Sequence, residues 1–383
     1  MKKTVVIKQT DDYDEDLIKS SLEDILAALG GLESVISPGD RVLLKVNLLM
    51  GKAPEEAITT HPLVVKVLTE MIQEIGGNVV IGDSPAGPFN TLSLKRAYSA
   101  AGLKEVADKT GAELNYNTED KKVEFAGEVS RSFTLAKFVT EADVVINLPK
   151  LKTHGLTMYT GAVKNLLGAI PGLTKAEYHL KMQQAFLFSK MLVDLALLVE
   201  PDLNIMDGII GMEGDGPSGG TPKKYGYLMA SKSPFALDVM GVHLMGINPL
   251  DNVPTIRAAA DRQLIANISE VEQKGDTLKP KTDTDIPEIE KQSNLIDQRL
   301  PDPINNIVAY FLRPRPVFDH EDCVGCRDCA EICPADTIDM VGEKPQKPEV
   351  DLDDCIRCFC CQETCKYRAI EVKRPLLGKL LFS

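Results

Sequence analysis

Hydrophobic positions up to residue 268 alternate between strand-like and helix-like patterns. Short runs rich in Val, Ile and Leu predict buried strands, at residues 5–7, 41–47, 78–83, 143–147 and 203–206. Apolar residues that recur every three or four positions predict helices, at residues 18–29, 62–75, 92–101, 177–199 and 235–245. Strands that alternate with helices are typical of α/β folds. We therefore expect a mostly parallel sheet with helices on both faces.

The pattern breaks down after residue 268. Residues 269–303 are rich in charge, contain several X-Pro steps and have no aromatic residue, which is typical of a segment that wraps or links domains. The Pro-rich stretch at 313–316 then precedes all of the cysteines. We expect an α/β domain over 1–268, a wrapping segment or linker over 269–316, and a small α+β domain over 317–383.

Composition excludes several classes of protein. Hydrophobic residues make up 44% of the chain and charged residues 26%, the balance of a globular protein with a sizeable core. A net charge of -13 argues against a nucleic-acid-binding surface, which needs clustered Lys and Arg. The sequence has no run of about 18 apolar residues and no long apolar stretch near its start, so we expect no membrane span and a cytoplasmic location.

All nine cysteines lie between residues 323 and 365. One run has the spacing C-x2-C-x2-C-x3-C, and a second run repeats it: Cys323, Cys326, Cys329 and Cys333, then Cys355, Cys358, Cys361 and Cys365. Such a run lets one loop wrap around a [4Fe–4S] cluster. Structural zinc is the alternative, but zinc sites seldom carry the third evenly spaced cysteine. Cys360 falls outside the spacing, and we interpret it as a packed or surface thiol.

The two runs resemble those of two-cluster bacterial ferredoxins, in which the fourth cysteine of each run ligates the other cluster. The resemblance implies one cluster on Cys323, Cys326, Cys329 and Cys365. It implies a second cluster on Cys355, Cys358, Cys361 and Cys333. Acidic residues around the runs indicate a low reduction potential. The partner implied is a low-potential electron donor or acceptor protein.

Four predicted strands finish on, or just before, a polar residue: Asn47, Asp83, Asn147 and Asp207. Each alone is typical of a turn or a helix cap. Ligands of open parallel sheets bind at the carboxyl ends of strands, so four such residues favour a shared cleft. Glycine-rich stretches follow at 82–87 and 208–220, and backbone N–H groups there can approach an anion. The second stretch equally fits a flexible lid, and neither matches a nucleotide-binding fingerprint.

Positive charge is concentrated after the strand at 143–147, where Lys150, Lys152 and Lys164 lie close in sequence to His154. A helix that begins near Thr160 would add its N-terminal dipole. Together these residues predict a site for a small anionic substrate, a carboxylate or a phosphate, with His154 placed for proton transfer. The alternative is a solvated basic patch that docks an acidic partner, which includes the chain's own cysteine-rich domain.

The candidate residues divide into two roles. We assign proton transfer and orientation of the substrate or a metal to the catalytic set, His154, Lys152, Asp83 and Asp207. Substrate binding falls to the polar neighbours of the same strand ends, Asn47, Ser84, Asn147, Lys150, Lys164 and Asn165. Three other histidines fit packing or capping: His61, His179 and His243. The sequence leaves open whether a flavin or a further metal fills the cleft.

These residues stand in motifs that resemble domain-of-unknown-function family 362. The matching stretches are Thr59–Pro62, Gly82–Pro85, Asn147–His154, Gly161–Asn165 and Asp207–Pro217. The resemblance extends over nearly the whole chain, and it implies an iron–sulfur protein of anaerobic metabolism without a settled reaction.

Three hypotheses for function follow. The first is an oxidoreductase in which two clusters relay electrons to or from an anionic substrate or cofactor in the α/β domain. The second is a non-catalytic electron-transfer protein that docks a partner redox enzyme, and the third is a redox or iron sensor. A bare carrier needs only the cysteine-rich part, so the large α/β domain favours the first.

Overall fold

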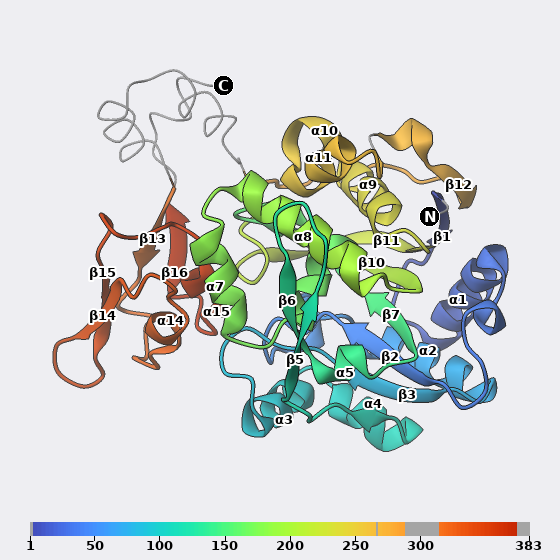
Figure 1. Ribbon diagram of the computed structural model, residues 1–383, viewed down its shortest axis with the longest axis horizontal. Helices are drawn as coiled ribbons and strands as arrows, with labels where there is room; N and C mark the ends of the chain where they lie inside the picture. Colours follow the sequence, from blue (N-terminus) through green and yellow to red (C-terminus); the bar gives the residue numbers. More distant parts are fainter. Residues whose placement is uncertain (1–2, 266, 288–313, 374–383) are drawn as a thin grey trace.

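The protein forms one large sheet in the computed structural model, which describes residues 3–265, 267–287 and 314–373 (Figure 1). Within these ranges the sheet has ten strands; eight follow the order β12-β1-β11-β10-β7-β2-β3-β4, and β8 pairs with β10 and β9. The bounds are β1 Thr4–Gln9, β2 Arg41–Val46, β3 Asn78–Gly82, β4 Glu113–Leu114, β7 Val144–Leu148, β8 Lys150–His154, β9 Met158–Thr160, β10 Leu203–Glu213, β11 Thr221–Ser231 and β12 Glu272–Gly275. Pairing is parallel from β10 through β7, β2 and β3 to β4, and β11 runs antiparallel to both neighbours.

Helices cover both faces of this sheet. On one face lie α1 Glu15–Leu29, α2 Pro62–Glu74, α3 Thr91–Ala100 and α4 Leu103–Thr110. On the other lie α6 Ala162–Asn165, α8 Ala185–Val199, α9 Pro234–Leu244 and α11 Pro254–Asp261. Strand β2 faces both layers, because Val42 and Leu44 pack with the first group and Leu43 with the second. The expected fold class is confirmed.

Smaller elements complete the α/β part. A two-stranded hairpin consists of β5 Asp120–Glu124 and β6 Ser132–Ala136. The remaining helices are α5 Lys137–Thr140, α7 Thr174–Lys181 and α10 Pro249–Asn252.

Strand β10 is longer than the predicted strand at 203–206 and runs on to Glu213. Its second half forms an antiparallel hairpin with β11, in which Gly208 pairs with Tyr227. The glycines that suggested a loop permit close packing instead: a Cβ atom on Gly211 would lie 2.6 Å from the backbone oxygen of Leu151. The prediction that Asp207 ends a strand is therefore wrong, since this residue lies inside β10.

The predicted helix at 177–199 is two helices, α7 and α8, with a break at 182–184. His179 of α7 stacks on Phe188 of α8 with their ring centroids 4.1 Å apart. Residues nine apart in one helix are separated by about 13.5 Å along its axis, so a continuous helix could not make this contact. The break turns α7 back over α8.

The cysteines lie in a small α+β unit, here called the cysteine module and comprising residues 314–373. Two antiparallel pairs of strands form it, β13 Arg315–Phe318 with β16 Ile370–Lys373 and β14 Ile338–Val341 with β15 Lys347–Val350. The helices α14 Asp328–Glu331 and α15 Cys360–Thr364 contain part of the two cysteine runs. Figure 1 shows the module beside α7.

The predicted linker at 269–316 begins as part of the large sheet, because β12 pairs in parallel with β1. Residues 288–313 of this segment lie outside the described residues, so the three-part division of the chain stays a prediction. No helix in the described ranges is long and apolar enough to cross a membrane.

Candidate functional site

Eight thiols of the cysteine module lie in two separate groups. One small cavity is lined by Cys323, Cys326, Cys329 and Cys365. A second is lined by Cys333, Cys355, Cys358 and Cys361, and Cys360 also reaches its wall. The fourth cysteine of each run thus lies with the first three of the other run, the arrangement that the ferredoxin resemblance implied.

The surroundings of these two groups have features of iron–sulfur sites. Among the described residues, no group of three His, Cys, Asp or Glu side chains is placed to hold a single metal ion. The two cavities contain about 360 and about 330 Å³ of space not filled by atoms. Backbone N–H groups also point at sulfur, from Gly325 to Cys323 Sγ at 3.4 Å and from Thr337 to Cys333 Sγ at 3.5 Å. N–H groups directed at sulfur are typical of iron–sulfur sites.

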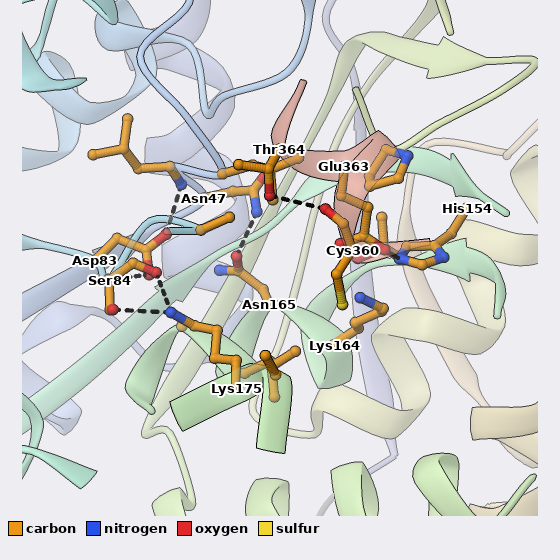
Figure 2. Close-up of a pocket in the computed structure, with 18 of the residues that line it drawn as sticks. Asn47, Asp83, Ser84, His154, Lys164, Asn165, Lys175, Cys360, Glu363 and Thr364 are labelled. Atoms are coloured by element: carbon orange, nitrogen blue, oxygen red, sulfur yellow. Dashed lines mark hydrogen bonds and ion pairs between the residues drawn. The ribbon is translucent and has the colours of Figure 1, made fainter. Parts of the chain in front are cut away.

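A larger cavity lies where the carboxyl ends of β2 and β3 meet the cysteine module (Figure 2). The space not filled by atoms in it and at its mouth is about 700 Å³. Its polar lining comes from the loops after β2 and β3, from β8 and β9, from α6 and α7, and from α15: Asn47, Asp83, Ser84, Lys152, His154, Thr160, Lys164, Asn165, Lys175, His179, Cys360, Glu363 and Thr364. We call this cavity the junction pocket. Seven of the predicted site residues line it, namely Asn47, Asp83, Ser84, Lys152, His154, Lys164 and Asn165.

Contacts across the junction hold the two parts of the pocket together. The Ser218 hydroxyl donates to the backbone oxygen of Gln362 at 3.4 Å, and Gln362 Nε2 donates to the backbone oxygen of Asp215 at 3.3 Å. An ion pair joins Arg368 to Glu56 at 3.3 Å. Helix α15, which carries Cys360 and Glu363, is therefore fixed as one wall of the pocket.

Lys164 supplies positive charge to the junction pocket. Its side chain lies on α6, and the residue is only 9% exposed. No hydrogen bond or ion pair joins its ammonium group to another described residue, whereas Lys152 Nζ donates to the backbone oxygen of Ile58 at 2.8 Å. The Glu363 carboxylate is near enough to interact with this charge but makes no direct contact with it, so the unused N–H donors of Lys164 favour a ligand that accepts hydrogen bonds, such as an anion.

His154 and Glu363 form a close pair at the module side of the pocket. His154 Nε2 lies 3.0 Å from Glu363 Oε1, but the direction of the ring N–H leaves both atoms without a well-formed hydrogen bond among the described residues. His154 Nδ1 accepts from the backbone N–H of Leu156 at 3.0 Å, which leaves the ring proton on Nε2. The pair therefore presents one N–H donor and one carboxylate acceptor to a ligand.

Burial and neighbouring charges set the protonation of this pair. Burial and the nearby Lys164 lower the pKa of His154 to about 4, so the ring is neutral near pH 7. Burial alone would raise the pKa of Glu363, but His154 and Lys164 outweigh it and hold that pKa well below the usual range. Glu363 is thus an ionised carboxylate beside a neutral imidazole.

Asp83 organises the opposite side of the pocket. Its carboxylate forms an ion pair with Lys45 Nζ at 2.7 Å and accepts from the backbone N–H of Leu48 at 2.6 Å. The next residue, Ser84, accepts from Lys175 Nζ at 2.9 Å and from the backbone N–H of Gly172 at 2.7 Å. These bonds join the loops after β2 and β3 to the start of α7, so Asp83 holds the shape of the pocket.

Lys150 and Asp207 do not line the junction pocket. Lys150 Nζ pairs with Asp207 Oδ2 at 2.8 Å, and both side chains are buried. Asp207 Oδ1 accepts from the Tyr13 hydroxyl at 2.8 Å, and Tyr13 stacks on His61, whose Nδ1 accepts from the first turn of α2 as the predicted cap. The expectation that four polar strand ends share one cleft is corrected here: this pair forms its own cluster.

Three further expectations change in this part of the fold. Asn147 is fully buried behind the pocket, where its side chain bonds to Asn165 and Asn204. The alternative of a basic patch is half right: Lys150, Lys152 and Lys164 are buried and not solvated, but the chain's own cysteine module does lie against this region, with Glu363 Oε1 3.0 Å from His154 Nε2. Helix α6 spans only Ala162–Asn165, too short to add a strong dipole.

Sequence reasoning missed four polar residues of the pocket: Lys175, His179, Glu363 and Thr364. A comparison of the two cysteine runs could have indicated Thr364, since the first run has Ile332 at the same place. Glu363 has Glu331 as its counterpart, so no such difference marks it. No sequence signal places Lys175 or His179 here, because α7 reaches the pocket only through its break from α8.

Comparisons with known proteins identify two regions of the chain. Residues 42–243 match the family model described as "Domain of unknown function (DUF362)", and residues 322–369 match the "4Fe-4S dicluster domain". A thylakoid-associated protein of Synechocystis sp. is 40% identical over 267 residues, which is 67% of this chain and 79% of that protein. The solved lactate racemase apoprotein of Thermoanaerobacterium thermosaccharolyticum is 14% identical with a TM-score of 0.41; the match covers 65% of this chain and 58% of that chain.

Proposed function

The chain belongs to the DUF362 family and carries a 4Fe-4S dicluster domain, and from this premise we propose that it is an oxidoreductase with its substrate site in the junction pocket. One observation carries the proposal. The pocket that holds Lys152, His154 and Lys164 is closed by α15, a helix within the second cysteine run. A ligand there would touch the same segment that binds a cluster.

The residues of the pocket have different roles toward a small anionic substrate. Bound [4Fe–4S] clusters supply or accept single electrons. Lys164 binds the negative charge, since its ammonium group makes no hydrogen bond or short ion pair with another described residue. His154 Nε2–H and the Glu363 carboxylate hold or move a proton at the ligand, being 3.0 Å apart. Helix α15 excludes water from the buried side.

We propose a low-potential electron donor or acceptor protein as the partner. Cys326 is the exposed thiol of the group formed by Cys323, Cys326, Cys329 and Cys365. This side of the module is available to a carrier, whereas Cys360 is buried in the wall of the pocket. A non-catalytic carrier would give no use to the hydrogen-bonding groups that His154 and Glu363 leave unpaired in the pocket, so the catalytic proposal is preferred.

Small anions test the proposal without knowledge of the substrate. In anaerobically purified protein reduced with dithionite, acetate or inorganic phosphate should change the electron paramagnetic resonance spectrum of the reduced clusters. Lys164→Met should reduce normally but bind the anion about 10- to 100-fold more weakly, because it lacks one charged hydrogen-bond donor. The matched control is Lys122→Met, at an exposed position of β5, which should respond like wild type. Spectra indifferent to both anions would reject the proposal.

Anion affinity should also fall as the pH rises through about 7. Burial and neighbouring lysines lower the pKa of Lys152 to about 7, and burial lowers the pKa of Lys175 to about 7 as well. Each amine carries its positive charge below that pH and loses it above. The charged groups that act on these two amines are Lys45, Asp83, Lys150, Lys164 and Glu363.

Calorimetric titration of the full chain with acetate across this pH range measures the effect. The pH dependence should be shallower in Lys152→Met, while the affinity at high pH stays close to that of wild type. An affinity that is flat with pH, or that rises, would contradict the assigned protonation.

A further inference from the structure

A chain of amide side chains runs from the interior of the sheet to the junction pocket. Asn47 Nδ2 donates to Asn165 Oδ1 at 2.8 Å, and Asn165 Nδ2 donates to Asn147 Oδ1 at 2.8 Å. Asn147 Nδ2 donates to Asn204 Oδ1 at 2.9 Å, and Asn204 Nδ2 donates to the backbone oxygen of Ser231 at 3.2 Å. The chain runs from β11 through β10, β7 and α6 to Asn47, which follows β2 and lines the pocket.

Backbone carbonyl groups set the direction of this chain. A carbonyl oxygen can only accept, so the amide group that faces it must present its NH₂. Ser231 O fixes Asn204 in this way, and Ala162 O, 2.9 Å from Asn147 Nδ2, fixes Asn147. Asn165 is then oriented twice, by Asn147 Oδ1 and by the backbone oxygens of Lys45 and Val46 at 3.4 Å. Its own oxygen must therefore face Asn47.

The orientation of the Asn47 amide group is therefore fixed as well. Asn47 has to donate through Nδ2 to Asn165 Oδ1, because a flipped Asn47 would bring two oxygens together. Asn47 Oδ1 is buried and has no hydrogen-bond donor among the described residues. Asn47 lines the junction pocket, so the wall there holds a buried acceptor of fixed orientation, whereas Lys164 supplies hydrogen-bond donors to the same pocket.

We propose that the junction pocket selects a small hydroxy-carboxylate, whose carboxylate binds Lys164 and whose hydroxyl group donates to Asn47 Oδ1. This inference rests on the proposed function, because it uses the same pocket and names the class of substrate. A neutral hydroxyl suits the position better than an ammonium group, since the lysines of this region, Lys45, Lys152, Lys164 and Lys175, outnumber its two carboxylates, Asp83 and Glu363. A ligand without a donor would leave Asn47 Oδ1 buried and unpaired, which is costly.

Three pairs of probes that differ only in a terminal hydroxyl test the proposal in the full, anaerobically purified protein. They are glycolate with acetate, 3-hydroxypropionate with propionate, and 4-hydroxybutyrate with butyrate, measured by calorimetry. In at least one pair the hydroxylated acid should bind about tenfold more tightly or better. The pair with the largest ratio reports the spacing between the two subsites. Equal affinities within all three pairs would overturn the proposal.

Variants separate the hydroxyl subsite from the anion subsite. Asn47→Leu should abolish the preference for the hydroxylated acid and leave the affinity for its deoxy partner nearly unchanged. Asn78→Leu, a matched change at the exposed start of β3, should keep the preference. Iron content and melting temperature establish that each variant is folded. Should Asn47→Leu fail to fold, the three wild-type ratios still decide the question.

The two proposals fail in different ways. If the deoxy acids bind and Lys164→Met weakens them, but no hydroxyl preference exists, the anion site stands and the hydroxy-carboxylate is wrong. If none of the six acids binds, the proposed substrate site itself is wrong. A hydroxyl preference that survives in Asn47→Leu would show that another acceptor, such as Glu363, is responsible, and would overturn the role of Asn47.

Discussion

Replacing Cys365 by alanine is expected to halve the iron content, from about eight to about four atoms per chain. Cys365 lies with Cys323, Cys326 and Cys329 around one cavity, although it belongs to the second run. Its loss should therefore remove the cluster of the first run. Cys333→Ala should also halve the iron content but remove the other cluster, because Cys333 lies with Cys355, Cys358 and Cys361.

The response to acetate distinguishes crossed from uncrossed ligation. The group that contains Cys358 borders the junction pocket, through Cys360 and Ile332 in its wall. The remaining cluster of Cys365→Ala should thus still change its spectrum on addition of acetate, and that of Cys333→Ala should not. If each run ligated its own cluster, these two results would be exchanged. Cys360→Ala serves as the control and should retain all of its iron, since it lies outside the spacing of both runs.

The fold could be predicted from local pattern wherever that pattern was unambiguous. Strands such as β2 and β3 are continuous apolar runs between turn residues, and helix α2 begins at Pro62 after His61. The second half of β10 could not be predicted, because its glycines are explained by the distant backbone of Leu151. The break between α7 and α8 depends likewise on a tertiary contact, the stacking of His179 on Phe188.

Some residues of the candidate site could also be predicted from local sequence, and others depend on distant contacts. Strand-end position was enough to bring Asn47, Asp83 and Ser84 to one cavity. The separation of Lys150 from Lys152 depends on how β8 pairs with β10. Lys150 lies opposite Asp207 and Lys152 opposite Met212, so the register shifts between them and leaves only Lys152 at the pocket. No property of residues 150–154 alone encodes that shift.

The position of Glu363 in the site depends on the contact between the cysteine module and the α/β part. In the sequence it stands between Cys361 and Cys365, where cluster binding explains the local pattern. Only the contact of α15 with the α/β part brings it within 3.0 Å of His154. A residue whose partner is more than 200 positions away, in another domain, cannot be assigned a role from spacing.

Replacing Asp207 by alanine is expected to lower the free energy of unfolding by about 3–5 kcal/mol. The change would leave the buried ammonium group of Lys150 without its carboxylate partner. Burial lowers the pKa of Lys150, and Asp207 raises it. The change would also remove the acceptor for the Tyr13 hydroxyl. Asp207→Asn should cost less, because its side-chain oxygen can still accept a hydrogen bond. Asp108→Ala is the matched control, since its ion pair with Lys104 is exposed and should contribute less than about 1 kcal/mol.

Urea unfolding followed by circular dichroism measures these differences, and the acetate titration separates stability from ligand binding. Below the unfolding transition, Asp207→Asn should bind acetate as wild type does, because Asp207 does not line the junction pocket. The opposite result would be an Asp207 variant that is as stable as wild type but no longer responds to acetate. It would support the catalytic role that the sequence first suggested for Asp207. The buried pair with Lys150 would then be a part of the substrate site, and the pocket would extend across β8 to β10.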